Sequence, residues 1–246
     1  MEKKKIYSAT LLICLFLFIT SIPLERVISS SWVLFSIQII LRLGFFIFAL
    51  YYIHKEELST LSFKRLKSNI LLILPFLLLC FSNYFVALVQ NSPRISFSTE
   101  FVIQSIIVYA FTALNEELIF RGVLFPLFKK NHTTFLSMLY SSLIFGAIHL
   151  LNINSLASIP YVLIQVLYCF GLGMLFSFLY MHTENLLIPI LFHFLFNVIN
   201  DTWITNHFDI SWDIYFFIIN LGLALIFAIY GYFIFKKDTQ KEREEN

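Results

Sequence analysis

Eight apolar runs, each close to the length needed to cross a lipid bilayer, dominate this sequence of 246 residues. A transmembrane helix needs about 20 mostly apolar residues, and only helices and closed barrels satisfy every backbone polar group inside a bilayer. Charged residues make up 13% of the chain, against about a quarter in soluble domains. The sequence therefore predicts an all-α integral membrane protein, an eight-helix transmembrane bundle. The predicted spans are residues 6–23, 32–53, 70–90, 101–124, 134–151, 161–180, 186–199 and 214–235.

The Lys and Arg residues between the runs indicate how the bundle is oriented. Cytoplasmic connectors carry an excess of these residues, and one set of alternate connectors holds nearly all of them here. Both the N-terminus and the C-terminus are therefore expected on the cytoplasmic side. The opposite set carries only Arg26 and Arg94, and the cytoplasmic set carries Lys3, Lys4, Lys5, Lys55, Lys64, Arg65, Lys67, Lys129, Lys130, Lys236, Lys237, Lys241 and Arg243.

The ends of several segments carry their own signals. The run at 6–23 lacks a small-x-small cleavage site and is followed by further spans, so it is predicted to be the first transmembrane helix and not a signal peptide. Pro126 is expected to end or kink the fourth span, because proline disfavours the helical conformation at the residue before it. Residues 54–69 form a basic amphipathic connector, and residues 236–246 are expected to be a short solvated charged tail.

Composition excludes other classes of protein. No basic patch is interleaved with aromatic residues, so nucleic acid is not an expected partner. Cys14, Cys80 and Cys169 each lie inside an apolar run without CxxC spacing. They are expected to pack as small hydrophobic side chains. Many Phe, Ile, Leu and Asn residues beside few Gly indicate an AT-rich genome, so a bacterial cell membrane is the expected location.

A few ionisable residues lie at membrane depth, where they are costly and usually face the interior of the bundle. Glu116, His149 and His193 are all expected roughly 12 to 23 Å from the cytoplasmic end of their spans, at 1.5 Å per helical residue. These three side chains can therefore meet in one pocket. The complete set is Arg42, Glu116, Glu117, Arg121, His149 and His193.

The adjacent carboxylates at 116 and 117 are predicted to differ. Glu117 and Arg121 are four residues apart with the acid first, so they share a helix face and can form an ion pair. Glu116 points about 100° away from Glu117 and has no cation on its own helix. An unpaired carboxylate in a dry environment is a candidate general base.

The two histidines each have a companion on the same helix face. Phe145 precedes His149 by four residues, and Asn197 follows His193 by four residues. Two imidazoles and a carboxamide beside an unpaired glutamate can activate a water molecule and hold an oxyanion. Hydrolysis is the reaction that these groups suit.

Structural interpretations compete with these functional ones. A histidine such as His149 is often a packing residue in membrane helices, and the Glu117–Arg121 pair could be purely structural. For Arg42 the favoured interpretation is a snorkelling or helix-bridging residue, with Gln38 as a neighbour. The predicted interhelical hydrogen-bonding residues are Asn115, Gln104 and Gln165, and the histidines predicted to lie in connectors without a role are His54, His132, His182 and His207.

Three motifs occur in order on three candidate helices. They are Glu116-Glu117-x-x-x-Arg121, Phe145-x-x-x-His149 and His193-x-x-x-Asn197. Together they resemble the signature motifs of the CPBP intramembrane proteases, which include the type II CAAX prenyl endopeptidases and the Abi proteins of bacteriocin processing and self-immunity. The resemblance divides a single domain into three N-terminal spans at 1–100, a catalytic core at 101–201, and a last span with a charged tail at 202–246.

The resemblance implies a role for each motif residue. Glu116 is implied to be the general base, acting with His149 on the attacking water. Glu117 and Arg121 are implied to support and position the substrate, and His193 and Asn197 to stabilise the oxyanion. Phe145 is implied to line the substrate pocket.

The need for a metal stays open at this level. Glu116, His149 and His193 would give a His/His/Glu set with a water in the fourth position, which is a known catalytic zinc arrangement. The HExxH spacing and a second carboxylate for each histidine are missing. A mechanism that requires no cofactor is therefore favoured, with zinc as the alternative.

The predicted function is that of an intramembrane endopeptidase. Its expected partners are the lipid bilayer and a peptide or C-terminal protein substrate, with or without a lipid anchor. Processing of a bacteriocin or pheromone precursor, or self-immunity, is preferred to CAAX prenyl cleavage. The alternatives from other classes are a non-catalytic immunity or peptide-binding protein and a proton-relaying transporter, although the two similar halves of many transporters are not evident.

Overall fold

The structure, a computed structural model, describes residues 30–55, 74–94, 98–153, 159–200 and 213–245, together with Ser8, Ile28, Phe208, Ile210 and Ser211. Over these residues the chain forms helices and no strand, apart from an isolated antiparallel bridge between Arg94 and Phe208. Most of the predicted first span, Cys14 and most of the basic connector at 54–69 lie outside the described residues.

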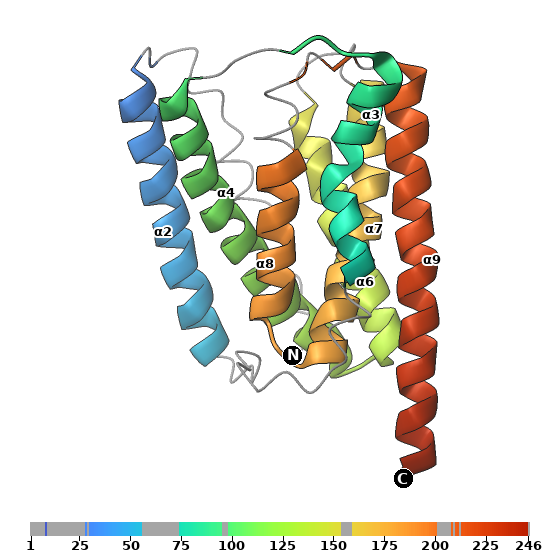
Figure 1. Cartoon of the computed structure of the whole chain (residues 1–246). Helices are drawn as coiled ribbons and strands as arrows, with labels where there is room; N and C mark the ends of the chain where they lie inside the picture. Colours follow the sequence, from blue (N-terminus) through green and yellow to red (C-terminus); the bar gives the residue numbers. More distant parts are fainter. Residues whose placement is uncertain are drawn as a thin grey trace.

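The helices form a bundle of roughly parallel rods (Figure 1). Helices α2 and α4 lie side by side along one edge, α9 follows the opposite edge, and the C-terminal end of α9 extends beyond the other helices. In chain order the elements are α2 (Ser31–Lys55), η3 (Leu74–Phe81), α3 (Ser82–Gln90), α4 (Thr99–Ile119), η4 (Phe120–Leu124), α5 (Phe125–Lys129), α6 (Thr134–Ala147), η5 (Ile148–Asn152), α7 (Ile159–Thr183), α8 (Leu187–Phe196) and α9 (Ile214–Glu245).

Helix lengths and outer surfaces fit a membrane protein. Within the described residues, 5 helices are long and apolar enough to cross a bilayer, and the helices at Pro75–Gln90 and Leu187–Asn200 are apolar but shorter. Large apolar side chains such as Ile40, Ile47 and Phe233 point outward and are exposed, as suits contact with lipid. The all-helical architecture is confirmed, while the count of eight spans and the cytoplasmic ends remain predictions.

Two helix ends differ from the prediction. The fourth helical rod continues to Lys129 instead of ending at Leu124. A π-helical turn at Phe120–Leu124 precedes Pro126, and Phe125 N–H donates to Phe120 O, five residues back. The wider turn accommodates a proline that has no N–H to donate and would otherwise crowd a preceding carbonyl. At the C-terminus, α9 continues as a helix through the expected solvated tail to Glu245.

The third predicted span begins as a tighter helix. Residues Leu74–Phe81 form a 3-10 helix that changes to α-helix at Ser82. At this change, Asn200 Oδ1 accepts hydrogen bonds from Ser82 Oγ at 3.0 Å and from Asn83 N at 2.8 Å. Asn200 thus caps α3 from another part of the chain and ties the end of the α8 segment to it.

A polar cap joins α3 to the start of α9. Asp213 Oδ1 accepts from the Tyr215 and Phe216 N–H groups at 2.9 and 3.1 Å, and from Gln90 Nε2 at 2.8 Å. Desolvation raises the pKa of the Asp213 carboxyl, but these hydrogen bonds outweigh it, so the pKa lies below its usual value. The carboxylate therefore holds α9 against the end of α3.

Helix α7 is the centre of the bundle and contacts α6, α8 and α9. Its approach to α6 depends on Gly146, where an added Cβ would lie 2.7 Å from Val166 O and 3.1 Å from Phe170 Cβ. We expect Gly146→Ala to lower the free energy of unfolding by about 1–3 kcal/mol, because the backbone oxygen cannot move aside easily. Thermal unfolding in detergent measures the change.

The matched control for this prediction is Gly44→Ala on α2. An added Cβ at Gly44 would meet nothing within 4 Å, so only the better helix propensity of alanine remains, at about 0.5–1 kcal/mol in favour of the folded state. Equal melting temperatures for the two variants would contradict the importance of close packing between α6 and α7.

Candidate active site

The three motifs lie on helical elements that pack together. Glu116 and Glu117 are near the end of α4, and Arg121 is in the π-helical turn that follows it. Phe145 is on α6, His149 on the 3-10 turn η5, and His193 on α8, with Asn197 in the next turn. Since α8 contacts α4 and η5 continues α6, residues far apart in sequence come together here.

Arg121 is the most completely enclosed charge of the site. Its Nη1 donates to Glu117 Oε1 at 2.9 Å, and both side chains are 0% exposed. Its Nη2 donates to Gly173 O at 2.6 Å. Aromatic rings surround the guanidinium, which is the arrangement in which cation–π attraction is strongest. The ring centroids lie at 5.8 Å for Phe120, 5.0 Å for Phe145 and 5.4 Å for Phe176.

Glu117 also holds a residue of another helix. His193 Nδ1 donates to the same Glu117 oxygen at 2.9 Å, and the ring of Phe176 stacks on the imidazole at 5.0 Å between centroids. The carboxylate therefore fixes both the rotation of the ring and the nitrogen that carries the proton. The pair at Glu117 and Arg121 is extended by His193 into a chain of three charged or polar groups across two helices.

Glu116 has a different environment from Glu117. Its Oε2 lies 3.8 Å from His193 Nε2, and its side chain is 12% exposed. This distance exceeds that of a hydrogen bond, but a water molecule can contact both atoms. Among the described residues no arginine or lysine forms an ion pair with Glu116, whereas Glu117 is both fully buried and paired.

His149 and His193 both lie against the Phe145 ring. Its Nδ1 donates to Phe145 O at 2.9 Å, which leaves Nε2 of the neutral ring as an acceptor. The Phe145 ring meets His149 and His193 edge-on, with centroids 5.5 and 5.9 Å apart. Glu116 and His193 both act electrostatically on His149. Phe145 is only 1% exposed, so it supports the two imidazoles from within the protein.

Glu116, His149 and His193 are the candidate metal ligands of the site. The described residues contain no group of three His, Cys, Asp or Glu side chains arranged to hold a metal ion. His149 Nδ1 and His193 Nδ1 are engaged with Phe145 O and Glu117. These contacts use only one nitrogen of each ring, so both imidazoles keep Nε2, the nitrogen with which such a histidine can bind a metal.

Two residues that lie outside the three motifs, Phe176 and Gly173, also shape the site. Phe176 stacks on His193 and covers Arg121, but it is one of 30 phenylalanines and carries no signal of its own. Gly173 offers its carbonyl to Arg121, and an added Cβ there would lie 3.0 Å from Ser142 Cβ. The Gly171-x-Gly173 spacing was an available signal, because small residues let membrane helices approach closely.

The predicted interhelical polar contacts are mostly confirmed. Asn115 Nδ2 donates to Arg42 O at 3.0 Å, and Asn152 Nδ2 donates to Gln165 Oε1 at 2.9 Å. The prediction for Gln104 is wrong within the described residues, because its Nε2 donates to Glu100 on the same helix. Exposed polar side chains one turn apart readily satisfy each other in this way.

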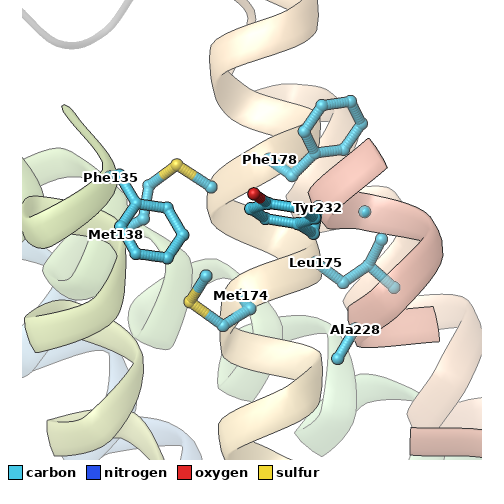
Figure 2. Close-up of a pocket in the computed structure, with 8 residues that line it drawn as sticks. Phe135, Met138, Met174, Leu175, Phe178, Ala228 and Tyr232 are labelled. Atoms are coloured by element: carbon cyan, nitrogen blue, oxygen red, sulfur yellow. The ribbon is translucent and has the colours of Figure 1, made fainter. Parts of the chain in front are cut away.

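A separate cavity between α6, α7 and α9 is shown in Figure 2. Its only side-chain oxygen is the Tyr232 hydroxyl, and none of the motif residues lines it. It is therefore distinct from the candidate site. The lining residues are Phe135, Met138, Met174, Leu175, Phe178, Ala228, Gly231 and Tyr232.

Comparison with known proteins identifies the part of the chain that holds this site. Residues 98–199 match the family model described as type II CAAX prenyl endopeptidase Rce1-like. No curated protein and no solved structure matches the chain significantly. The matched segment begins just before α4, includes all three motifs and ends within the turn that carries Asn197. Over residues 98–199, the chain is therefore similar to the Rce1-like group of the CPBP, or CAAX protease, family.

Proposed function

We propose that this protein is an intramembrane endopeptidase of the CAAX type, which hydrolyses a peptide bond near the C-terminal end of a membrane-associated peptide or protein. The family match supports protease activity. The observation that carries the mechanism is the contrast between two adjacent acids. Glu117 is fully buried and paired, whereas Glu116 is partly exposed and faces His193 across 3.8 Å.

Glu116 acts as the general base in this proposal. A water molecule beside its carboxylate gives up a proton to Glu116 as the water oxygen bonds to the scissile carbonyl carbon. His149 assists, because its Nδ1–H is donated to Phe145 O and its Nε2 can accept a hydrogen bond from the same water. The surrounding apolar side chains strengthen these interactions by excluding bulk solvent.

His193 and Asn197 stabilise the negative oxygen that forms on the carbonyl. Since His193 Nδ1–H is donated to Glu117, Nε2 can donate to the oxyanion only when the ring carries both protons. Asn197, one turn further along, is 9% exposed and supplies an amide donor.

The intermediate then collapses to products. The carbon–nitrogen bond breaks, and the proton held by Glu116 passes to the leaving nitrogen, which leaves a new carboxyl group and a new amine. Glu117 and Arg121 contribute by positioning His193 from the buried side. Phe145 holds the two imidazoles apart at fixed distances.

The substrate is proposed from the comparison. The matching family model names a prenyl endopeptidase, so a peptide with a prenylated cysteine near its C-terminus is the first substrate to test. An unmodified precursor peptide of the bacteriocin or pheromone kind is the second, and immunity through such processing would follow from its cleavage. Helices long and apolar enough to cross a bilayer support a membrane-associated substrate of either kind.

The proposal is tested with the full-length protein in detergent micelles. We expect release of a C-terminal fragment from a farnesylated peptide, measured by mass spectrometry, and slower release from the same peptide without the lipid. A chelator should leave the rate unchanged, because the chain's own groups carry each step. Absence of cleavage of both peptides would contradict the proposed function, and a rate lost on chelation and restored by zinc would overturn its metal-independent form.

A further inference from the structure

Arg42 is a second arginine at membrane depth, and the motifs do not include it. It lies near the middle of α2, and its Nε donates to Thr112 Oγ1 on α4 at 3.2 Å. Its Nη1 donates to Gln38 O at 3.3 Å, and its own carbonyl accepts from Asn115 Nδ2 at 3.0 Å. The predicted helix-bridging role is therefore real, and it occupies two of the three guanidinium nitrogens.

The remaining N–H groups of the Arg42 guanidinium bind no carboxylate among the described residues. Within the described part of the chain, both hydrogen bonds of the guanidinium go to neutral oxygens and no acidic side chain lies within ion-pair distance. Nη2 donates to none of these described residues. The side chain is partly exposed. This differs from Arg121, which is 0% exposed and forms an ion pair with Glu117. A cation left without an anion in an apolar bundle is costly unless a ligand supplies the anion.

The position of Arg42 relative to Glu116 suggests which ligand that is. Thr112, which anchors the guanidinium, precedes Glu116 by four residues on α4, so the two are about 6 Å apart along the helix axis. Glu116 also acts electrostatically on Arg42. An extended peptide advances about 3.3–3.6 Å per residue. A chain whose scissile carbonyl lies at Glu116 would therefore bring a group about two residues further along to Arg42.

We propose that Arg42 binds the C-terminal carboxylate of the substrate, about two residues beyond the cleaved bond. A carboxylate that enters an apolar bundle needs a cation, and a guanidinium with free N–H groups can donate to it in a charge-assisted pair. The inference rests on the proposed function and adds a specificity-determining residue outside the matched segment.

The test compares two farnesylated peptides that differ only at the C-terminus, one a free acid and one an amide. For the unchanged protein we expect KM to be about 10- to 100-fold lower for the acid, the ratio that a charge-assisted hydrogen bond gives. Arg42→Gln should remove this preference by raising KM for the acid alone. Arg42→Lys should retain part of it, and Thr112→Val should weaken it by freeing the guanidinium.

The KM values for the two peptides are compared on one protein sample, so a smaller folded fraction does not affect their ratio. Equal use of acid and amide by the unchanged protein would overturn the role of Arg42 while leaving the proposed function intact. So would an equal loss on both substrates in Arg42→Gln, which is the result of a purely bridging residue. Cleavage of neither peptide by the unchanged protein would overturn the proposed function, and this inference with it.

Discussion

Replacing Glu116 with glutamine is expected to lower kcat by about 10²- to 10⁴-fold, the usual contribution of a general base. Glutamine has nearly the same shape but cannot take a proton from water. Glu116 is 12% exposed and its Oε2 lies 3.8 Å from His193 Nε2, beyond hydrogen-bond distance, so little of the folded structure depends on it. Release of the C-terminal fragment from the farnesylated peptide gives kcat, and thermal unfolding confirms the fold.

The matched control is Glu184→Gln, the same chemical change at an exposed turn beyond α7. It should retain the kcat of the unchanged protein. If Glu116→Gln also retained that kcat, Glu116 would not be the base. If neither protein cleaved peptide but both bound it, the alternative of a non-catalytic peptide-binding protein would gain.

Replacing Arg121 with methionine is expected to have the largest effect on stability. The guanidinium is 0% exposed and binds Glu117 Oε1 at 2.9 Å and Gly173 O at 2.6 Å. Its loss leaves the buried Glu117 carboxylate with only His193 as a partner. Removing one member of a buried ion pair costs about 3–5 kcal/mol, and unfolding by a denaturing detergent measures the free energy.

Two further variants separate the charge effect from the loss of packing. The double variant Glu117→Gln with Arg121→Met should be more stable than Arg121→Met alone, because the unpaired charge is gone. Arg94→Met removes an exposed arginine and should change stability little. Arg121→Met unfolding at the same free energy as Arg94→Met would show that the enclosed ion pair does not stabilise the bundle.

The helical architecture followed from the sequence because it depends on local properties. Each run of about 20 apolar residues must satisfy its own backbone in a bilayer, so the class of structure was fixed by length and composition. Helix ends were less predictable. Pro126 marked the right place on the fourth helix, but a proline can be accommodated by ending, kinking or widening a helix, and the chain forms the π-helical turn at Phe120–Leu124.

The contacts between polar groups of the site were likewise predictable within one helix and not predictable between helices. The ion pair between Glu117 and Arg121 is a contact between residues four apart on one helix, so spacing alone predicted it. The second partner of Glu117, His193, is 76 residues away in sequence. Neither that contact nor the stacking of Phe176 on the imidazole could be predicted from a pattern within one helix.

The sequence by itself determined that this chain is a helical membrane protein with two acids, two histidines and two arginines at membrane depth, because the cost of burying charge makes such residues stand out. Only the tertiary structure decided which acid is enclosed, which imidazole it holds, and that Arg42 reaches Thr112 one turn from Glu116. The physical reason is that spacing fixes neighbours along one helix, whereas packing between helices fixes neighbours across the bundle.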